Sequence, residues 1–364
     1  MKNKKLWLIV GAIAIVAAIA FVFSPRRAPV PADDKPIIKI GVSLPLSGDV
    51  AILGKSIKGA LEIALAEIPA NSKYKYEFVF SDDNYELKKI AINQNRHISV
   101  DKSDALISVF DGTAVTAPIA EKHHIPHIGC TWGSKFFAQY PYSINHWSRT
   151  DTQARAFIKM LKDEEISSIA IVSVNFSSNE ELVGHVADMA KQSGITVTSA
   201  NFINKGTKDF RAIIEQIRRQ KPAAVMFLLL DPEIGVFSKQ ITETKLNIPI
   251  VAIDNLHSAQ YPELLNGAKF VYSSIGEDKF VAKLSKHNLI TVPCVANLYD
   301  GFKILVNIYE SADHKLTGEE IKDHLYKIKD YPSALGVKIS VDKDGIIDSP
   351  LIRARIVESK MIKE

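Results

Sequence analysis

Strand-like and helix-like stretches alternate along almost the whole chain, and this alternation restricts the fold more than any other feature. The first pair is a buried-strand run at Ile37–Leu44 and a helical stretch at Lys55–Ile68, where apolar residues recur every three or four positions. Each strand–helix unit takes roughly 25–30 residues, the size of a βα repeat. Such repeats place the strands parallel and cover the sheet with helices on both faces. The predicted class is therefore α/β, with doubly wound parallel sheets.

The alternation falls into two series, separated by a break at Tyr142–Asp151. The first series adds the expected strands Tyr76–Phe80, Ala105–Phe110 and Pro126–Gly129 and the helices Leu87–Ile98 and Val115–Lys122. The second has the strands Ser168–Val172, Thr196–Asn201, Ala224–Leu230 and Pro249–Ile253 and the helices Thr152–Leu161, Glu180–Gln192, Phe210–Arg219 and Glu233–Thr244. The chain then closes with the strand Lys269–Ser273, the helices Val295–Tyr309 and Gly318–Lys329, and the strands Val337–Val341 and Ile352–Val357.

Length and charge support two folding units and exclude one class of partner. The 364 residues are 46% hydrophobic and 24% charged, an ordinary globular composition, and about 100–200 residues form a typical domain. The net charge of +4 lies entirely in residues 1–35, so residues 36–364 are neutral. A neutral body lacks the basic surface that nucleic acid requires, and no nucleic-acid partner is expected.

The N-terminus reads as a membrane-targeting segment. After a cationic start, Leu6–Phe23 is an uninterrupted apolar run of 18 residues. A helix of that length spans roughly 27 Å, close to the hydrocarbon thickness of a bilayer. The run is longer than the apolar region of most cleaved signal peptides, which favours an uncleaved signal anchor over residues 1–23; a cleaved signal peptide or a buried core helix are the alternatives. Residues 24–36 form a Pro-rich tether, and the remaining chain is expected outside the cytoplasm, tethered to the membrane by Leu6–Phe23.

Two motifs suggest cofactor or metal chemistry and fail on spacing. Gly48 and Gly54 precede Lys55-Ser56 as in a phosphate-binding loop, but five residues separate the glycines where that loop needs four. A cluster of potential metal ligands straddles a helix end and a buried strand, so its side chains should diverge: Glu121, His123, His124, His127 and Cys130. No catalytic motif is recognisable. We therefore expect no metal, no cofactor and no enzyme activity.

Several segments together resemble a known family. Ile38–Gly54, followed by an alanine-rich helix, is similar to the opening of the leucine/isoleucine/valine-binding proteins, which serve branched-chain amino acid ABC transporters and have the type I periplasmic binding fold. The resemblance covers nearly all of residues 37–358 and continues in Ser81–Asn84, Asp111–Pro118, Ser168–Val172, Leu230–Gly235 and Tyr299–Gly301. It implies two α/β lobes joined by three crossover strands. Lobe one would comprise residues 37–149 plus 274–334, and lobe two residues 150–273 plus 335–358.

The resemblance also implies a function. It indicates a monomeric extracytoplasmic solute-binding protein that closes two lobes around a small amino-acid-like solute and delivers it to an ABC permease. The alternative is a sensor domain of the same fold that acts through a partner, with an amide or a small carboxylate as its ligand.

Within the resemblance, the ligand carboxylate would bind where strands of lobe one end. Gly112 and Thr113 stand at one such end, with helical N–H groups assisting. Thr131 stands at the next strand end. Gly133 aligns with a position where the family often has Ser or Thr, and the adjacent Ser134 would supply the hydroxyl group instead.

The remaining ligand-binding residues would come mostly from lobe two. Asp254 aligns with the family's acidic partner of the ligand ammonium, and Asp231 is the second candidate. Ser178 and Leu230 align with aromatic residues that pack on the ligand in leucine-binding members. Two aromatic residues lie close enough in sequence to take their place, or to belong to the core: Trp132 and Phe176.

The two cysteines, Cys130 and Cys294, both align with the ligand side of lobe one. An oxidising compartment permits a disulfide between them. Two buried thiols are nevertheless the favoured expectation.

Overall fold

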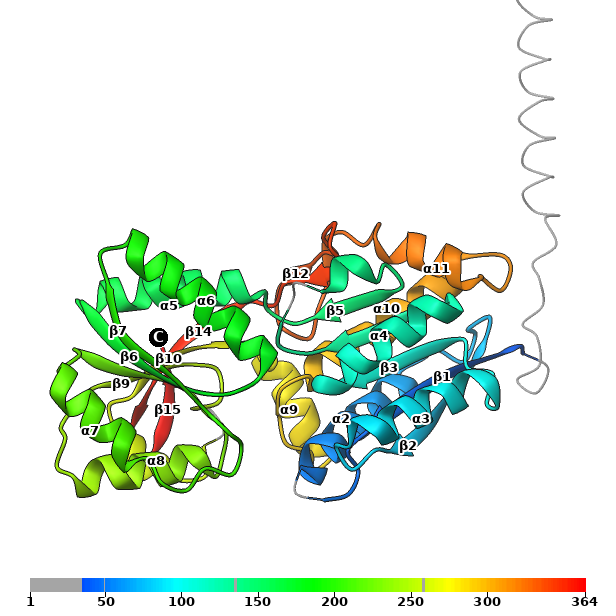
Figure 1. Ribbon diagram of the computed structural model, residues 1–364. Coiled ribbons are helices and arrows are strands. Elements are labelled where there is room, and N and C mark those ends of the chain that lie inside the picture. The colour runs from blue at the N-terminus through cyan, green and yellow to red at the C-terminus, as the bar shows by residue number, and fades with distance from the viewer. Residues whose placement is uncertain (1–34, 49, 134–135, 257–258) are drawn as a thin grey trace, which may run out of the picture.

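The computed structural model describes residues 35–48, 50–133, 136–256 and 259–364, and the expected anchor Leu6–Phe23 lies outside them. These residues form two α/β lobes that lie side by side, each built on its own sheet (Figure 1). The predicted α/β class with parallel-sheet lobes is confirmed. No helix in these described ranges has the length and apolarity to cross a membrane.

Lobe one is built on a six-stranded sheet in the order β13-β5-β4-β3-β1-β2, and every pairing in it is parallel. Its strands are β1 (Ile37–Leu44), β2 (Lys75–Asp82), β3 (Ala105–Val109), β4 (His127–Cys130), β5 (Ser143–His146) and β13 (Ile346–Ile347). Helices α2 (Ala51–Ala66) and α10 (Val295–Ser311) pack on one face, and α3 (Leu87–Ser99) and α4 (Asp111–His123) on the other (Figure 1). The lobe also contains η1 (Phe137–Gln139), α9 (Asp278–Lys286), α11 (Gly318–Leu325) and a small sheet of β11 (Tyr331–Pro332) and β12 (Lys338–Ile339).

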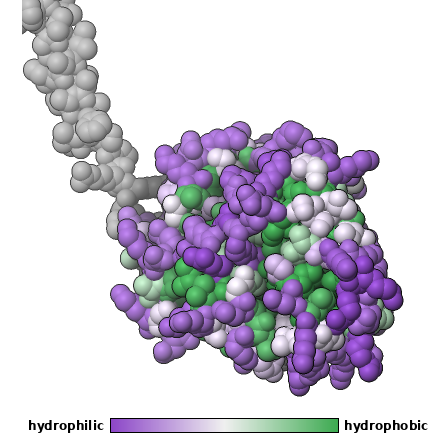
Figure 2. All heavy atoms as spheres, turned by 90° about the vertical axis from the view of Figure 1, so that its left-hand side faces the viewer, coloured by the Kyte–Doolittle hydropathy of each residue, from purple (hydrophilic) through white to green (hydrophobic). Residues whose placement is uncertain are grey.

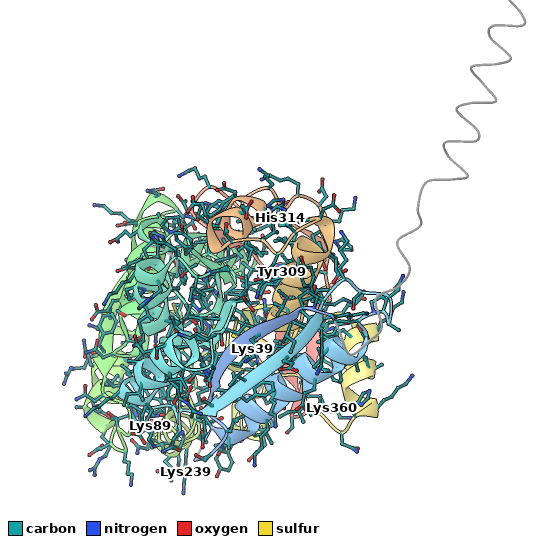
Figure 3. All side chains as sticks on the ribbon, turned by 90° about the vertical axis from the view of Figure 1, so that its right-hand side faces the viewer. Lys39, Lys89, Lys239, Tyr309, His314 and Lys360 are labelled. Atoms are coloured by element: carbon teal, nitrogen blue, oxygen red, sulfur yellow. A yellow bond between two sulfur atoms is a disulfide. The ribbon has the colours of Figure 1, made fainter. Side chains whose placement is uncertain are left out.

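Helix α10 is the centre of the lobe-one core. Most of its residues are buried, including Phe302 and Tyr309. The buried Tyr309 ring meets the rings of Tyr74 and Tyr76 edge-on at centroid distances of 6.0 and 6.4 Å, and Figure 3 shows Tyr309 above Lys39 of β1. A helix that is apolar on most sides requires burial, which explains its place between α2 and the sheet.

Lobe two is built on a seven-stranded sheet in the order β15-β14-β10-β9-β8-β6-β7. Its strands are β6 (Ser168–Val174), β7 (Thr196–Ile203), β8 (Ala224–Leu228), β9 (Ile250–Ile253), β10 (Lys269–Ser273), β14 (Leu351–Val357) and β15 (Lys360–Lys363). One face packs on α5 (Thr150–Asp163) and α6 (Ser177–Gln192), and the other on α7 (Arg211–Gln220), α8 (Glu233–Glu243) and η3 (Pro262–Leu265). The strands are parallel except β14 and β15, which pair antiparallel at one edge. Seen from this lobe's end, the surface is mostly hydrophilic, with scattered apolar patches (Figure 2).

The chain passes between the lobes three times, at residues 147–149, 274–277 and 348–350. The three passages are hydrogen-bonded to one another. Ser148 Oγ donates to the Ser349 carbonyl at 2.9 Å, and the Ser274 N–H donates to the Pro350 carbonyl at 2.8 Å. Three hydrogen-bonded segments therefore join the lobes, an arrangement typical of a hinge between domains.

The third passage comes later in the chain than the family resemblance implies. The expected boundary gave residues 335–358 to lobe two, but Leu335 and Ile339 lie in the lobe-one core and β13 pairs with β5. The chain therefore crosses after Ile347. Strand β13 has only two residues and produces no recognisable strand pattern, whereas β12 lies within the expected strand Val337–Val341 and pairs with β11.

Cys130 and Cys294 form a disulfide, and the expectation of two thiols was wrong. Cys130 ends β4 and Cys294 directly precedes α10, so both lie at the carboxyl edge of the lobe-one sheet, with Cα atoms 5.7 Å apart. The bond joins residues 164 positions apart in sequence. It closes a loop that includes five of the seven strands of lobe two.

Candidate ligand-binding site

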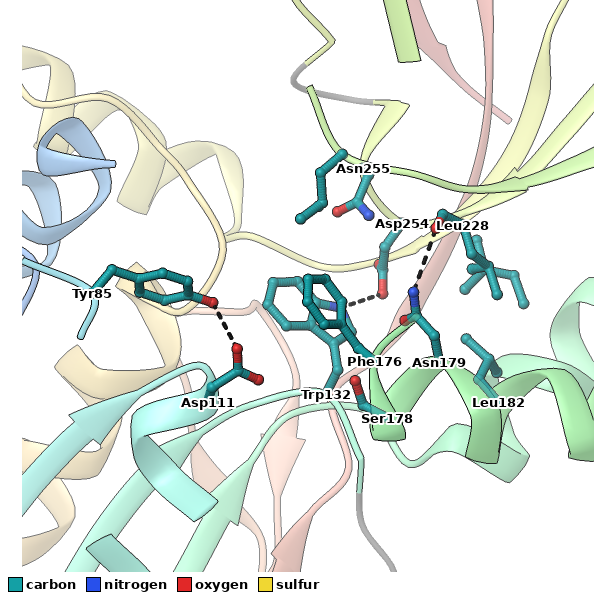
Figure 4. A pocket seen from close by; sticks show the side chains of 12 residues that line it. Tyr85, Asp111, Trp132, Phe176, Ser178, Asn179, Leu182, Leu228, Asp254 and Asn255 are labelled. Atoms are coloured by element: carbon teal, nitrogen blue, oxygen red, sulfur yellow. Dashed lines mark hydrogen bonds between the residues drawn. The ribbon is translucent and has the colours of Figure 1, made fainter. Parts of the chain in front are cut away.

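A cavity lies between the lobes, at the carboxyl ends of strands from both sheets (Figure 4). Its empty volume, mouth included, is about 490 Å³. Open α/β sheets bind ligands at this edge. The lining residues are Tyr85, Asp111, Trp132, Phe176, Ser178, Asn179, Leu182, Leu228, Leu230, Ile253, Asp254 and Asn255.

Trp132 provides the wall on the lobe-one side. It follows β4, and its ring stacks on Phe110 with centroids 5.5 Å apart and planes 17° apart. Trp147 meets it edge-on at 5.4 Å. Its indole Nε1–H donates a hydrogen bond to Asp254 Oδ2 at 3.1 Å, directly from lobe one to lobe two (Figure 4). The two lobes are thus in contact across the cavity.

Asp254 follows β9 in lobe two and is 3% exposed. Oδ1 accepts the Ser273 N–H at 2.7 Å, and Oδ2 also accepts Gln153 Nε2–H at 3.1 Å. Burial raises the pKa of Asp254 to about 6, against the opposing effect of these donors. Its φ of +56° is rare for a residue with a side chain, and such backbone outliers cluster at functional sites.

Asp111 and Tyr85 line the cavity from lobe one. Asp111 is the first residue of α4, directly after β3, and its Oδ2 accepts the Tyr85 hydroxyl at 3.1 Å (Figure 4). The pKa of the Tyr85 hydroxyl is raised, mainly by burial and secondly by the nearby Asp111 carboxylate. The tyrosine therefore stays protonated and acts as a donor toward Asp111.

A second cavity adjoins the first and shares Asp111, Trp132 and Ser178 with it. We refer to the two cavities together as the cleft. Gly133 lines the second cavity with φ +89°, and a Cβ atom there would lie 3.3 Å from Ser178 Cβ. Glycine therefore permits a close approach of the lobes at a position where the family resemblance suggested a hydroxyl. The second cavity is lined by Asp111, Ala114, Thr131, Trp132, Gly133, Phe136, Gln139, Ser177, Ser178 and Glu181.

Most residues expected at the site line the cleft: Thr131, Trp132, Gly133, Phe176, Ser178, Leu230 and Asp254. Gly112 and Thr113 do not. A Cβ at Gly112 would face Ile90 of α3, and Thr113 is fully buried with its hydroxyl 3.4 Å from Ser108 Oγ, inside lobe one. Asp231 lines neither cavity and accepts the Gln260 N–H at 2.7 Å. Ser134 lies outside the described residues.

The sequence analysis missed several polar residues that line the cleft, among them Asp111 and Tyr85. Asp111 immediately precedes the Gly112-Thr113 pair that was selected, and it is Asp111 that lines the cleft at this strand end. Tyr85 lies in the loop after β2, another strand end on the same edge of the sheet. Asn179 and Glu181 lie in the first turn of α6, where the strand-end argument also applies.

The histidines near the end of α4 serve the fold. His127 lies inside the sheet of lobe one between Ser108 Oγ and Ser143 Oγ, at 2.8 and 3.0 Å, and burial lowers its pKa to about 3. His124 stacks on the Tyr142 ring with centroids 5.0 Å apart. Over the described ranges, no three His, Cys, Asp or Glu side chains are grouped to hold a metal ion.

Comparison with known proteins identifies the class that this two-lobed fold and cleft define. A family model described as periplasmic binding protein matches residues 37–360. The chain belongs to this family, and the resemblance to leucine/isoleucine/valine-binding proteins is confirmed. The family comprises solute-binding proteins of ABC transporters, and the homologues are periplasmic.

Individual relatives are distant but span the whole fold. The Leu/Ile/Val-binding protein BraC3 of Rhizobium johnstonii is 24% identical, over 86% of this chain and 89% of its own length. The leucine-binding protein LivK of Thermotoga maritima superimposes with a TM-score of 0.80 at 21% identity, covering 90% of this chain and 97% of that protein. A solute-binding protein of Rhodopseudomonas palustris, solved with 3,4-dihydroxybenzoic acid, gives a TM-score of 0.78 at 17% identity, covering 90% and 96%. At these identities the two structures show the shared fold alone.

Proposed function

We propose that the protein captures a small amino-acid-like solute in the cleft and delivers it, as a monomer, to an ABC permease. The cavity between the lobes, with Trp132 and Asp254 hydrogen-bonded across it, carries this proposal. A solute enclosed there would touch both lobes and so favour the closed arrangement over the open one. A permease that recognises the closed arrangement would then receive loaded protein.

Asp254 is the proposed partner for an amino group of the solute. It is buried at a strand end of lobe two, and its carboxylate faces the cavity (Figure 4). Because a desolvated ammonium needs an anionic or polar acceptor, a buried carboxylate is a suitable partner. Phe176 and Leu230 provide apolar surface beside it for the rest of the solute.

The test is a thermal-shift panel of amino acids, their amides, amines and small carboxylates. A solute present at 100 times its dissociation constant stabilises the folded protein by about 2.7 kcal/mol, which gives a readily measured rise in melting temperature. The expected result is stabilisation by at least one amine-bearing solute, followed by calorimetric titration. A panel in which no solute binds contradicts the proposal.

A further inference from the structure

The hydrogen bond between Trp132 and Asp254 joins the two lobes through protein groups alone. The Trp132 indole Nε1–H donates to Asp254 Oδ2 at 3.1 Å, and the acceptor residue is 3% exposed (Figure 4). Burial raises the pKa of Asp254 to about 6, so its carboxylate is ionised at pH 8. A hydrogen bond to a charged acceptor is stronger than a neutral one, and seclusion from water strengthens it further. Contact between the lobes at this point therefore requires no solute.

The donor side of this bond is fixed within lobe one. The backbone just before the tryptophan is held by Asn145 of β5, whose Oδ1 accepts the Thr131 N–H at 3.0 Å and whose Nδ2–H donates to the Thr131 carbonyl at 3.1 Å. The preceding residue, Cys130, is joined to Cys294 by the disulfide. Because the ring also stacks on Phe110, little conformational freedom is lost when the indole N–H meets its acceptor.

The acceptor side is fixed within lobe two. Gln153, fully buried on α5, donates from Nε2 to Asp254 Oδ2 at 3.1 Å and to Ser273 Oγ at 3.3 Å. The Ser273 N–H donates to Asp254 Oδ1 at 2.7 Å. These bonds all lie within lobe two, so separation of the lobes leaves them intact. The carboxylate is therefore oriented toward the indole before the lobes meet.

Two other contacts between the lobes are weaker. Lys363 Nζ of β15 lies 3.3 Å from Asp278 Oδ1 of α9, but the Asp278 side chain is 95% exposed, and exposed ion pairs contribute little. Lys205 Nζ lies 5.7 Å from the centroid of the Tyr85 ring, and an exposed lysine gains only modestly from such a contact. Of the three contacts, the buried indole–carboxylate bond contributes most to holding the lobes together.

We propose that the Trp132–Asp254 bond is a latch that holds the two lobes closed when no solute is bound, and that Gln153 positions the carboxylate for it. This inference goes beyond the proposed function, because it concerns the protein without a solute. A single hydrogen bond contributes only modestly to stability, so the latch opens to admit a solute and then forms again.

Pulsed electron paramagnetic resonance on the full-length protein in detergent tests the latch. Spin labels are attached to Lys88→Cys on α3 and Lys239→Cys on α8, two exposed positions on different lobes; the native cysteines do not react because they form the disulfide. The labelled parent is denatured in guanidinium without a reductant, refolded, and shown by mass spectrometry to be free of solute. At pH 8 its main distance should match the structure, in which the lobes are in contact. A parent with any other main distance overturns the latch and leaves the proposed function standing.

The variant Trp132→Phe removes the indole donor and keeps an aromatic ring. A second distance should appear, with the ratio of closed to open protein about tenfold lower or less, as expected for loss of a hydrogen bond to a charged group. The matched control is Tyr85→Phe, which also removes one hydrogen bond at the cleft, but a bond to Asp111 that lies within lobe one. Identical distance distributions in Trp132→Phe and Tyr85→Phe overturn the latch.

The variant Gln153→Met tests the positioning residue. It keeps the length of the side chain and removes both hydrogen bonds that the amide donates. It should open the lobes as Trp132→Phe does, and the double variant should open them no further, because both changes act through one bond. An unchanged distance in Gln153→Met, or additive opening in the double variant, removes Gln153 from the latch. Trp132→Phe leaves the core of lobe two untouched, so it tests the latch even if Gln153→Met does not fold.

Discussion

The disulfide between Cys130 and Cys294 should account for a large part of the stability of lobe one. The bond joins residues 164 positions apart, and the chain-entropy relation gives about 5 kcal/mol at 25 °C for a loop of that length. The stabilisation acts on the unfolded chain, because the closed loop restricts that state far more than it restricts the native state. Total stabilities of folded domains are about 5–15 kcal/mol, so loss of the bond should be easy to detect.

Guanidinium denaturation followed by circular dichroism measures this contribution. Oxidised wild-type protein is compared with the same protein under a reductant, and with the double variant Cys130→Ala, Cys294→Ala. The free energy of unfolding, extrapolated to zero denaturant, should fall by about 5 kcal/mol on reduction and by a similar amount in the variant. Reduced wild type is the packing control, since it keeps both sulfur atoms.

Two results would refute this reasoning. Two free thiols titrated in denatured, unreduced protein would show that the bond is absent. A bond that is present but changes the free energy of unfolding by less than about 1 kcal/mol would show that the unfolded chain does not behave as the loop-entropy relation assumes.

Three further predictions follow from other residues. Asp254→Ala should weaken binding of an amine-bearing solute about 30- to 3,000-fold in calorimetry, because losing one member of a buried charged pair costs about 2–5 kcal/mol; unchanged affinity would show that Asp254 is not the partner of the amino group. Burial raises the pKa of Asp300 to about 7, so the free energy of unfolding of the wild type should fall by up to about 4 kcal/mol as pH rises from about 4 to 7. Asp300→Asn should therefore match the wild type at pH 4 and be more stable than the wild type at pH 8. Identical pH profiles of the two proteins in denaturant melts would contradict this. Full-length protein in its native cells should fractionate with membranes through Leu6–Phe23, and a soluble form beginning near Phe21 would contradict the anchor.

Much of the fold could be predicted because its central elements have strong periodic patterns. Strand β1 is a run of mostly buried residues, and α10 shows an apolar face over four turns, so both were recognised close to their observed bounds. The edges were harder to predict. Strand β15 contains two lysines in four residues, and β13 has only two residues, so these strands depend on pairing with neighbours instead of on local pattern.

The site was predictable where topology alone determines position and unpredictable where side-chain direction matters. The family resemblance selected Trp132 and, together with its strand end, Asp254, and both residues line the cleft. Their hydrogen bond joins residues 122 positions apart from different lobes, and no local pattern encodes such a pair. Thr113 does not line the cleft, because α4 begins at Asp111 and the threonine side chain is directed toward Gly129 in the sheet.

The place of Trp132 gives the protein an optical reporter of its own state. The sequence has three tryptophans, of which Trp7 belongs to the N-terminal apolar run and Trp132 and Trp147 adjoin the cleft. Separation of the lobes would break the indole bond to Asp254 and expose the Trp132 ring to water, while Trp147, at 1% exposure, stays buried in lobe one. Intrinsic fluorescence of the two-lobed region therefore follows the angle between the lobes without any attached dye, and Trp147→Phe would reduce that signal to a single emitter at the cleft.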